Sequence, residues 1–341
     1  MNDTLNVGLI GAGRIGRLHA EHLAHRISET NLCVLADLDE HAAQRCARQL
    51  AVPKVSSDYR TLLDDPTLDA VVICSSTDTH ARMIEAAASA GKHIFCEKPI
   101  AFDLATIDRA LAAVAEAGVT LQIGFNRRFD ASYRRVREAV LNGEIGEPHL
   151  LHLISRDPAP PPITYINTSG GLFLDMTIHD FDMARFLTGS EVETVYTAAS
   201  VRVDEAIGAA GDLDTAVVML TFENGVIGTI DNSRRAVYGY DQRVEVFGSG
   251  GSVQSGNAYP NTVTLQTARH VHRDLPLHFF LERYAESFLA EMKAFAAAVL
   301  EGRPAPVTGF DGRAPVAIAL AAHQSYRQQR PVRVQDSISA R

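Results

Sequence analysis

The stretch VGLIGAGRIG, residues 7–16, decides the fold of this chain. A short apolar run ends in a Gly-x-Gly-x-x-Gly pattern, and a helical pattern continues from Ile15 to Ile27. In a strand–turn–helix unit, these glycines allow a tight turn, close approach of the backbone to a pyrophosphate, and close packing of helix on strand. The helix N-terminus adds unpaired N–H groups and the positive end of a dipole. The pattern therefore predicts a dinucleotide-binding Rossmann unit.

A carboxylate should follow the second strand of such a unit, about 20 residues beyond the glycines, to accept hydrogen bonds from the adenosine ribose. Asp37 meets this requirement because it closes the apolar run of residues 32–36. The next residues, Leu38 and Asp39, offer no cation for a 2′-phosphate. The sequence therefore predicts NAD as the cofactor, in preference to NADP.

The alternation of apolar runs and helical patterns continues as far as residue 124, which indicates a parallel sheet covered on both faces. Beyond Asn126 the pattern changes to strands with few helices between them, and an Asn-Gly turn at 224–225 indicates a hairpin. We expect helices at 132–141, 174–187, 279–300 and 312–327, and strands at 192–203, 215–222, 226–232, 242–247 and 263–265. The fold class is thus an α/β Rossmann domain (1–125) followed by an α+β domain with a large open, mostly antiparallel sheet (126–341).

Composition narrows the functional class. The 341 residues carry a formal charge of -9, which disfavours a nucleic-acid partner because such partners attract basic proteins. None of the four cysteines forms a Cys-x-x-Cys pair, so we expect a reducing compartment without disulfides. The first residues do not resemble a signal peptide, and no apolar run reaches membrane-spanning length. We therefore expect a cytoplasmic protein that does not enter a membrane.

Two loops at predicted strand ends carry polar groups, where ligands of such sheets bind. In the loop of residues 75–80 the hydroxyls are either cofactor ligands or helix caps, and both roles are compatible with one residue. In the other loop, Glu97-Lys98-Pro99, the lysine is placed beside the expected nicotinamide. Oxidation of a C–OH group needs a base for the hydroxyl proton and benefits from positive charge near the developing alkoxide.

The expected helix at 174–187 carries the other candidates. At 100° per residue, Asp175, His179 and Asp182 fall within about 60° of one another. This spacing fits an oriented acid/base pair, a surface ion pair or a metal site. Because the sequence places no further strong ligand beside these residues, we expect no metal.

Other polar clusters are less informative. His270 and His272 are typical of a solvated strand end. The arginines at 127, 128, 134, 135 and 137 are typical of a solvated helix face, with Arg127 placed near the cleft.

Four motifs together resemble the Gfo/Idh/MocA oxidoreductase family, which is named after glucose–fructose oxidoreductase and inositol dehydrogenase. They are the glycine pattern at 11–16, Glu97-Lys98-Pro99, the segment GFNRRFD at 124–130, and Gly170-Gly171 leading to Asp175 and His179. The resemblance covers nearly the whole chain. It implies a homotetramer assembled through the open sheet, and a Lys98–Pro99 bond that is cis.

The resemblance also implies roles for individual residues. His179 would take the hydroxyl proton, Asp175 would orient it, and Lys98 would hydrogen-bond the reacting oxygen. The implied cofactor-binding residues are Gly11, Gly13, Arg14, Ile15, Gly16, Asp37, Ser75, Ser76, Thr77, His80, Glu97 and Lys98. The implied substrate-binding residues are Asn126, Arg127, Asp182, Tyr238 and Tyr240.

Segments 169–186, 232–247 and 279–284 resemble the inositol 2-dehydrogenases of the family. They imply NAD-dependent oxidation of myo-inositol to 2-keto-myo-inositol, as in inositol catabolism. Two alternatives stay open. One is a dehydrogenase for another cyclitol or sugar, such as scyllo- or chiro-inositol, glucose or xylose. The other is a non-catalytic NAD-sensing regulator.

Overall fold

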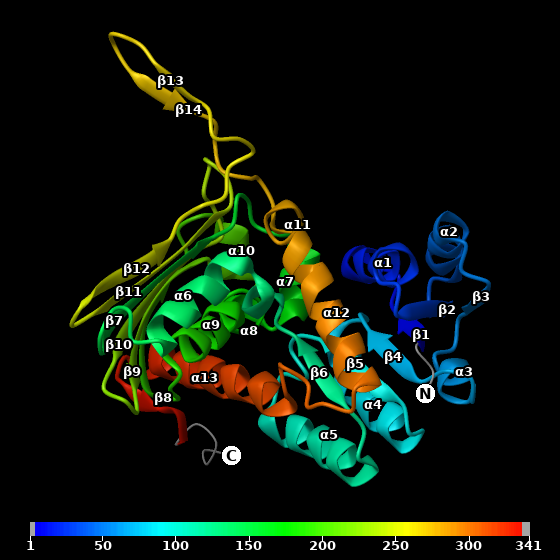
Figure 1. Ribbon diagram of the computed structural model, residues 1–341. Coiled ribbons are helices and arrows are strands. Elements are labelled where there is room, and N and C mark those ends of the chain that lie inside the picture. Colours follow the sequence, from blue (N-terminus) through cyan, green and yellow to red (C-terminus); the bar gives the residue numbers. More distant parts are fainter. Residues whose placement is uncertain (1–3, 336–341) are drawn as a thin grey trace. The chain divides into compact units, whose positions relative to one another are not determined.

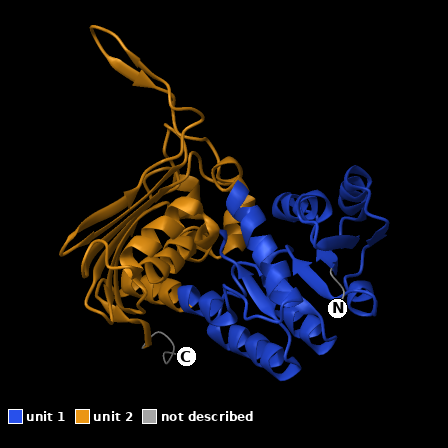
Figure 2. Cartoon of the chain, in the orientation of Figure 1, with its two compact units in different colours: residues 1–126, 286–316 blue, residues 127–285, 317–341 orange. Residues whose placement is uncertain are grey.

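The computed structural model describes residues 4–335, which form two compact units (Figure 2). Unit 1 contains residues 1–126 and 286–316, and unit 2 contains residues 127–285 and 317–341. The expected change near residue 126 is therefore present. The expected second domain of residues 126–341, however, is not a single unit, because residues 286–316 belong to unit 1.

Unit 1 contains a six-stranded parallel sheet with strand order β3-β2-β1-β4-β5-β6, as the sequence predicts for a Rossmann fold. The strands are β1 (Leu5–Ile10), β2 (Thr30–Ala36), β3 (Lys54–Ser56), β4 (Ala70–Ile73), β5 (His93–Glu97) and β6 (Leu121–Gly124). The helical segments are α1 (Arg14–Glu21), η1 (His22–Arg26), α2 (Glu40–Leu50), α3 (Arg60–Leu63), α4 (Thr77–Ser89) and α5 (Leu104–Ala117). All four residues of β4 are buried, as expected of a strand covered on both faces.

Local sequence sets the limits of these helices. Asp39 caps α2 by accepting a hydrogen bond from the Ala42 N–H at 3.1 Å, and Asp103 caps α5 in the same way through Thr106. Gly118 ends α5 with φ of 65°, as predicted from the glycine. The first helix is shorter than expected, because a π-helical segment, η1, replaces its last turns.

Helix α12 (Ala285–Leu300) explains why a late segment belongs to unit 1. Its residues Leu289, Met292, Phe295 and Ala296 lie in one apolar core with residues of β1, β2, β5 and α2. The ring of Phe295 meets Phe95 edge to face, with 5.9 Å between the centroids. Hydrophobic burial thus joins this helix to a sheet that precedes it by some two hundred residues.

Unit 2 contains a seven-stranded sheet in the order β12-β11-β7-β10-β9-β8-β15. The strands are β7 (Pro148–Arg156), β8 (Val192–Ser200), β9 (Thr215–Phe222), β10 (Ile227–Ser233), β11 (Asp241–Gly248), β12 (Gly251–Ser255) and β15 (Val332–Arg333). Every pairing is antiparallel except that of β7 with β10, which confirms the predicted sheet type. The sequence prediction missed β7, which lies inside the sheet.

The helices of unit 2 lie along one side of this sheet (Figure 1), and α6 and α9 pack together. The helical segments are η2 (Asn126–Phe129, from the end of unit 1), α6 (Ala131–Leu141), α7 (Ile163–Ser169), α8 (Gly171–Asp175), α9 (Ile178–Thr188), α10 (Glu205–Ala209), α11 (Phe280–Arg283) and α13 (Gly309–Gln328, shared by both units). A separate hairpin, β13 (Thr264–Gln266) with β14 (Val271–Arg273), extends from the unit and is exposed throughout (Figure 1). His270 and His272 lie there, as expected of a solvated strand end.

Among residues 4–335, no helix has both the length and the apolar character needed to cross a membrane.

Candidate functional site

Two of the three glycines in the loop of unit 1 are required by close packing, and the third faces open space. Gly11 has φ of +100°, and a Cβ there would lie 2.6 Å from the Cys74 carbonyl group. A Cβ on Gly16 would overlap the Gly11 carbonyl oxygen. Nothing lies within 4 Å of a Cβ built on Gly13, although its backbone conformation suits any residue. Packing therefore explains Gly11 and Gly16, whereas the space at Gly13 fits the close approach of a pyrophosphate.

Asp37 is held against this loop. Its Oδ2 accepts a hydrogen bond from the Ala12 N–H at 2.6 Å, and its Oδ1 accepts one from the Asp39 N–H at 2.8 Å. The carboxylate keeps lone pairs for further donors. Its position at the end of β2 suits the ribose of a dinucleotide, so the residues present fit NAD.

In the loop of residues 75–80, some side chains hold the protein structure together and others make no capping hydrogen bond. Ser76 is the N-cap residue of α4, but its side chain makes no capping hydrogen bond, whereas the hydroxyls of Ser75 and Thr79 lie 2.7 Å apart. His80 is buried and bridges two carbonyl oxygens, that of Pro99 at 2.8 Å and that of Ser75 at 3.0 Å. His80 thus ties two loops of the expected cofactor site together, and its own contact with the cofactor stays a prediction.

The Glu97-Lys98-Pro99 loop follows β5, and its Lys98–Pro99 bond is cis, as the resemblance implied. Lys98 is half-buried. The Glu97 carboxylate lies beside Gly124, where a Cβ would approach it to 3.1 Å, so the absence of a side chain there leaves room for it. Glu97 Oε1 lies 2.8 Å from His19 Nε2, which makes a hydrogen bond between the residue next to Lys98 and helix α1.

Glu291 of α12 completes a buried cluster with His19 and Glu97. The three donor atoms lie within 4.8 Å of one another, a grouping that could hold a metal ion. The 2.8 Å contact between His19 and Glu97 is a hydrogen-bond distance and leaves no room for an ion between those two atoms. Neither carboxyl oxygen of Glu291 has a hydrogen-bond partner among residues 4–335. Burial, and then the charge of Glu97, raise the pKa of Glu291 well above its ordinary value.

In unit 2, the expected single helix at 174–187 is two helices. Helix α8 ends at Asp175, Met176 and Thr177 form a turn, and α9 begins at Ile178. The Thr177 hydroxyl donates to Asn232 Oδ1 at 2.6 Å, which fixes the turn to the sheet. The 100° spacing argument therefore does not apply to Asp175 and His179. They lie on either side of a helix break, Asp175 at the end of α8 and His179 in the first turn of α9.

Asp175 is held by two donors. The Tyr165 hydroxyl donates to its Oδ1 at 2.8 Å, and Arg234 Nη1 donates to its Oδ2 at 3.3 Å. His179 is half-buried. An Asp with fixed orientation near the start of α9 is compatible with the role of orienting a base.

The two arginines at 127 and 128 correct the prediction of a solvated helix face. Arg127 is 5% exposed and donates to Asp180 at 2.7 Å, while Arg128 donates to Asp182 at 2.6 Å. Asp182 is 1% exposed. The buried carboxylate of Asp182 balances the charge of Arg128, and its contact with a substrate stays a prediction.

The remaining expected substrate residues are also held by the protein. Asn126 is buried, and its amide donates to Ser287 Oγ at 3.2 Å. Tyr240 OH accepts from Arg127 at 3.3 Å, and Tyr238 OH donates to Asp241 at 2.5 Å. These hydrogen bonds fix the positions of the polar groups of all three residues.

Sequence reasoning missed Asp157 and Arg234. Burial raises the pKa of Asp157 to about 7; Asp175 also raises it, and Arg234 and Arg127 oppose the rise. Asp157 follows the missed strand β7 at its carboxyl end, so recognition of that strand would have directed attention to it. Arg234 follows β10 directly and is almost fully buried.

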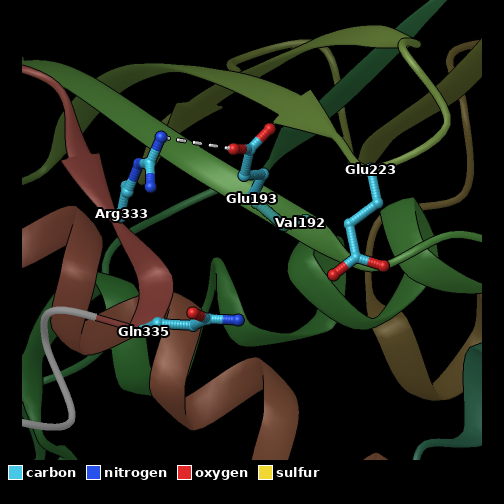
Figure 3. Close-up of a pocket in the computed structure, with 5 residues that line it drawn as sticks. All are labelled: Val192, Glu193, Glu223, Arg333 and Gln335. Carbon is cyan, nitrogen blue, oxygen red and sulfur yellow. Dashed lines mark ion pairs between the residues drawn. The ribbon is translucent and has the colours of Figure 1, made fainter.

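A cavity of about 310 Å³ lies elsewhere in unit 2, beside β8 and β15 (Figure 3). Val192, Glu193, Glu223, Arg333 and Gln335 line it, and Arg333 pairs with Glu193 at 3.8 Å. None of the expected site residues lines this cavity.

Comparison with known proteins agrees with the geometry of both units. A family model described as "Oxidoreductase family, NAD-binding Rossmann fold" matches residues 5–125, and one described as "GFO/IDH/MocA C-terminal domain" matches residues 133–254. The myo-inositol 2-dehydrogenase of Thermotoga maritima is 49% identical over 98% of this chain and 100% of that protein. The inositol 2-dehydrogenase of Rhizobium meliloti is 44% identical over 97% of this chain and 99% of that protein.

A solved structure, a probable dehydrogenase from Thermotoga maritima, superimposes with a TM-score of 0.96 at 49% identity, covering 98% of this chain and 100% of that one. The matches together span both units. This chain therefore belongs to the GFO/IDH/MocA family of oxidoreductases and uses NAD through its Rossmann domain.

Proposed function

We propose that the protein oxidises myo-inositol to 2-keto-myo-inositol with NAD⁺ as the acceptor. The full-length similarity to proteins named myo-inositol 2-dehydrogenase and inositol 2-dehydrogenase, at 49% and 44% identity, carries this proposal. The paired orientation of Asp175 by Tyr165 and Arg234 supports it, because an oriented carboxylate next to a histidine suits proton abstraction from a hydroxyl.

In this reaction the carbon–hydrogen bond breaks with its electron pair, the hydroxyl loses its proton, and a carbonyl forms. NAD, when bound, supplies the hydride acceptor. His179 takes the hydroxyl proton and Asp175 orients its imidazole. Lys98 donates a hydrogen bond to the reacting oxygen and stabilises its developing negative charge.

The proposal includes the cofactor contacts, which the unit 1 geometry supports. Gly13 gives the pyrophosphate access to the backbone, with Gly11, Arg14, Ile15 and Gly16 shaping the loop around it. Asp37 binds the adenosine ribose, and the loop groups Ser75, Ser76, Thr77, Glu97 and Lys98 complete the set. Asn126, Arg127, Tyr238 and Tyr240 contribute to substrate binding.

A screen of NADH formation tests the substrate. The panel contains myo-, scyllo- and chiro-inositol, glucose and xylose, each with NAD and with NADP. Highest turnover with myo-inositol and NAD is expected. Highest turnover with another polyol would identify that polyol as the substrate and would leave the proposed mechanism unchanged. Tight NADH binding without any turnover would favour a regulator that senses NAD.

Variants test the base. We expect His179→Ala to bind NADH as the wild type does and to lose roughly 100-fold or more in turnover, the usual contribution of a general base. His41→Ala, at an exposed position on α2, is the matched control. Unchanged turnover in His179→Ala would remove His179 from the mechanism.

The assembly is part of the proposal: a homotetramer formed through the outer face of the unit 2 sheet. Ile227, Leu150 and Phe247 lie on three neighbouring strands in one cross-strand row and are 46%, 37% and 44% exposed. Exposed apolar rows of this kind are typical of protein interfaces. Light scattering after size-exclusion chromatography measures the oligomer, and Ile227→Glu is expected to dissociate it.

The proposed location is the cytoplasm, where inositol catabolism would use the enzyme. The four cysteines are all free, which suits a reducing compartment. Cell fractionation with an antibody against the protein tests this location.

A further inference from the structure

Arg234 is a buried cation next to the expected active-site carboxylate. It follows β10, and its side chain is 1% exposed. Its Nη1 donates to Asp175 Oδ2 at 3.3 Å, and its Nη2 lies 3.7 Å from Asp212 Oδ2. Its Nε and Nη2 have no hydrogen-bond partner among residues 4–335. Burial of a guanidinium with incomplete hydrogen bonding is costly, so the position needs a compensating reason.

The two carboxylates that face Arg234 lie at opposite ends of one short helix. Asp212 Oδ1 accepts a hydrogen bond from the Leu172 N–H at 2.9 Å, in the first turn of α8, and Asp175 is the last residue of α8. Gly171 makes room for this contact, since a Cβ there would lie 2.7 Å from Asp212 Oδ1 and its φ is +80°. Arg234 therefore ties both ends of α8 to the end of β10.

The charges around Arg234 show what this contact does for Asp175. Asp175 and Asp212 both lie within 4 Å of the guanidinium, and the charge of Arg234 also acts on Asp157. Burial raises the pKa of Asp157 to about 7, with Arg234 opposing the rise and Asp175 adding to it. Without Arg234, the pKa of Asp157 would rise further, because the cation that favours its ionised form would be gone.

From these contacts we infer that Arg234 is a positioning residue for hydride transfer: it fixes the direction of the Asp175 carboxylate at the end of α8. The inference rests on the proposed function, in which Asp175 orients His179. Tyr165 holds the other oxygen of Asp175, so the tyrosine and the arginine together define the plane of the carboxylate.

The pH dependence of activity distinguishes this role from simple packing. The other titratable and charged groups of the region are Asp157, Asp180 and Arg127 on one side, Asp212 and His323 on the other, and Tyr165. All of them remain in an Arg234→Gln variant, so a change in the profile reports the loss of the cation. A nearby cation disfavours protonation of the groups around it. Its loss should therefore move the acid limb of kcat/KM to higher pH.

The experiment compares Arg234→Gln, Arg234→Lys and the exposed neighbour Arg235→Gln with the wild type, using myo-inositol and NAD. For Arg234→Gln we expect kcat to fall roughly 100-fold, as for misplaced catalytic groups, with an unchanged Kd for NADH. Arg234→Lys should restore the acid limb through its charge and only part of kcat, because a lysine lacks the fixed fork of the guanidinium. Arg235→Gln should match the wild type.

A second variant pair keeps the test decisive. Arg234→Gln added to Asp175→Asn should lower kcat little further, since both changes remove the same interaction. Unchanged kcat in Arg234→Gln, or a lower kcat with the wild-type pH profile in both Arg234 variants, would overturn the inference. A wild type inactive on every polyol would instead overturn the proposed function. If Arg234→Gln fails to fold by circular dichroism, the pH profile and kcat of Arg234→Lys decide.

Discussion

Replacement of Glu291 by glutamine should stabilise the protein at neutral pH. Glu291 is fully buried, and neither of its carboxyl oxygens has a hydrogen-bond partner among the described residues. Burial and the neighbouring Glu97 raise its pKa well above the ordinary value of 4.5, which favours the neutral carboxyl group in the folded state. A glutamine amide has nearly the same shape and is neutral at every pH.

The size of the effect follows from proton linkage. Below pH 4.5, the ordinary value, Glu291 is protonated in both the folded and the unfolded chain, so its full contribution to stability is present. As pH rises above that value the unfolded chain ionises while the folded chain stays neutral, and stability falls by about 1.4 kcal/mol per pH unit. The loss continues until the folded pKa is passed. Glu291→Gln avoids this loss.

Urea unfolding followed by circular dichroism measures the difference. At about pH 5 the variant and the wild type should have similar midpoints, and the variant should gain stability as the pH rises toward about 7.5. Glu116→Gln, at an exposed position on α5 in the same unit, is the control and should leave the pH dependence unchanged. A Glu291→Gln variant that is less stable at all pH values would refute the reasoning. Metal analysis of the purified protein would then test whether a cation bound by His19, Glu97 and Glu291 neutralises the carboxylate.

Three further changes test other features. Phe295→Ala should lower the free energy of unfolding by about 3–5 kcal/mol, because it leaves a cavity in the core shared by α12 and the Rossmann sheet. Phe310 is 56% exposed, so Phe310→Ala should lower the free energy of unfolding far less in the same urea titration. Asp37→Ala should raise the Kd for NADH roughly 10-fold or more, the value of a hydrogen bond to a charged group, when binding is followed by NADH fluorescence. Equal affinity in that variant would exclude the ribose contact. Asp182→Asn should destabilise the protein by about 3 kcal/mol in thermal unfolding, since it leaves Arg128 without its buried counter-ion. Unchanged stability would contradict this structural role and favour a role of Asp182 in substrate binding.

The sequence was a good guide where local pattern and structure coincide. The glycine loop, Asp37 at the end of β2 and the Gly118 helix end all follow from short-range chemistry, and the structure has them as predicted. Strand β7 was missed because Pro148 and two histidines obscure its alternation. Its alternate residues Leu151, Leu153 and Ser155 are buried on one face of the sheet, where α9 packs against β7.

The misread parts of the site depend on distant partners. Arg127 and Arg128 look like surface residues until Asp180 and Asp182, more than fifty positions away, are placed beside them. The break between α8 and α9 depends on Asn232 from the sheet, which accepts the Thr177 hydroxyl. Arg234 is in the same situation, since its partner Asp175 precedes it by 59 residues. Spacing along one helix could not reveal any of these contacts.

The split of unit 1 along the sequence has a consequence for biosynthesis. The first 126 residues leave the ribosome without α12, and the 159 residues of 127–285 must be made before Glu286 appears. At bacterial and eukaryotic rates of about 5–20 residues per second, this delay is roughly 10–30 s. During that time the apolar surface that Met292 and Phe295 later cover is open to solvent or to chaperones. A nascent chain arrested before residue 286 should therefore be far more sensitive to protease in its Rossmann segment than the released protein, and a gene fragment that ends at residue 126 should yield an aggregation-prone product.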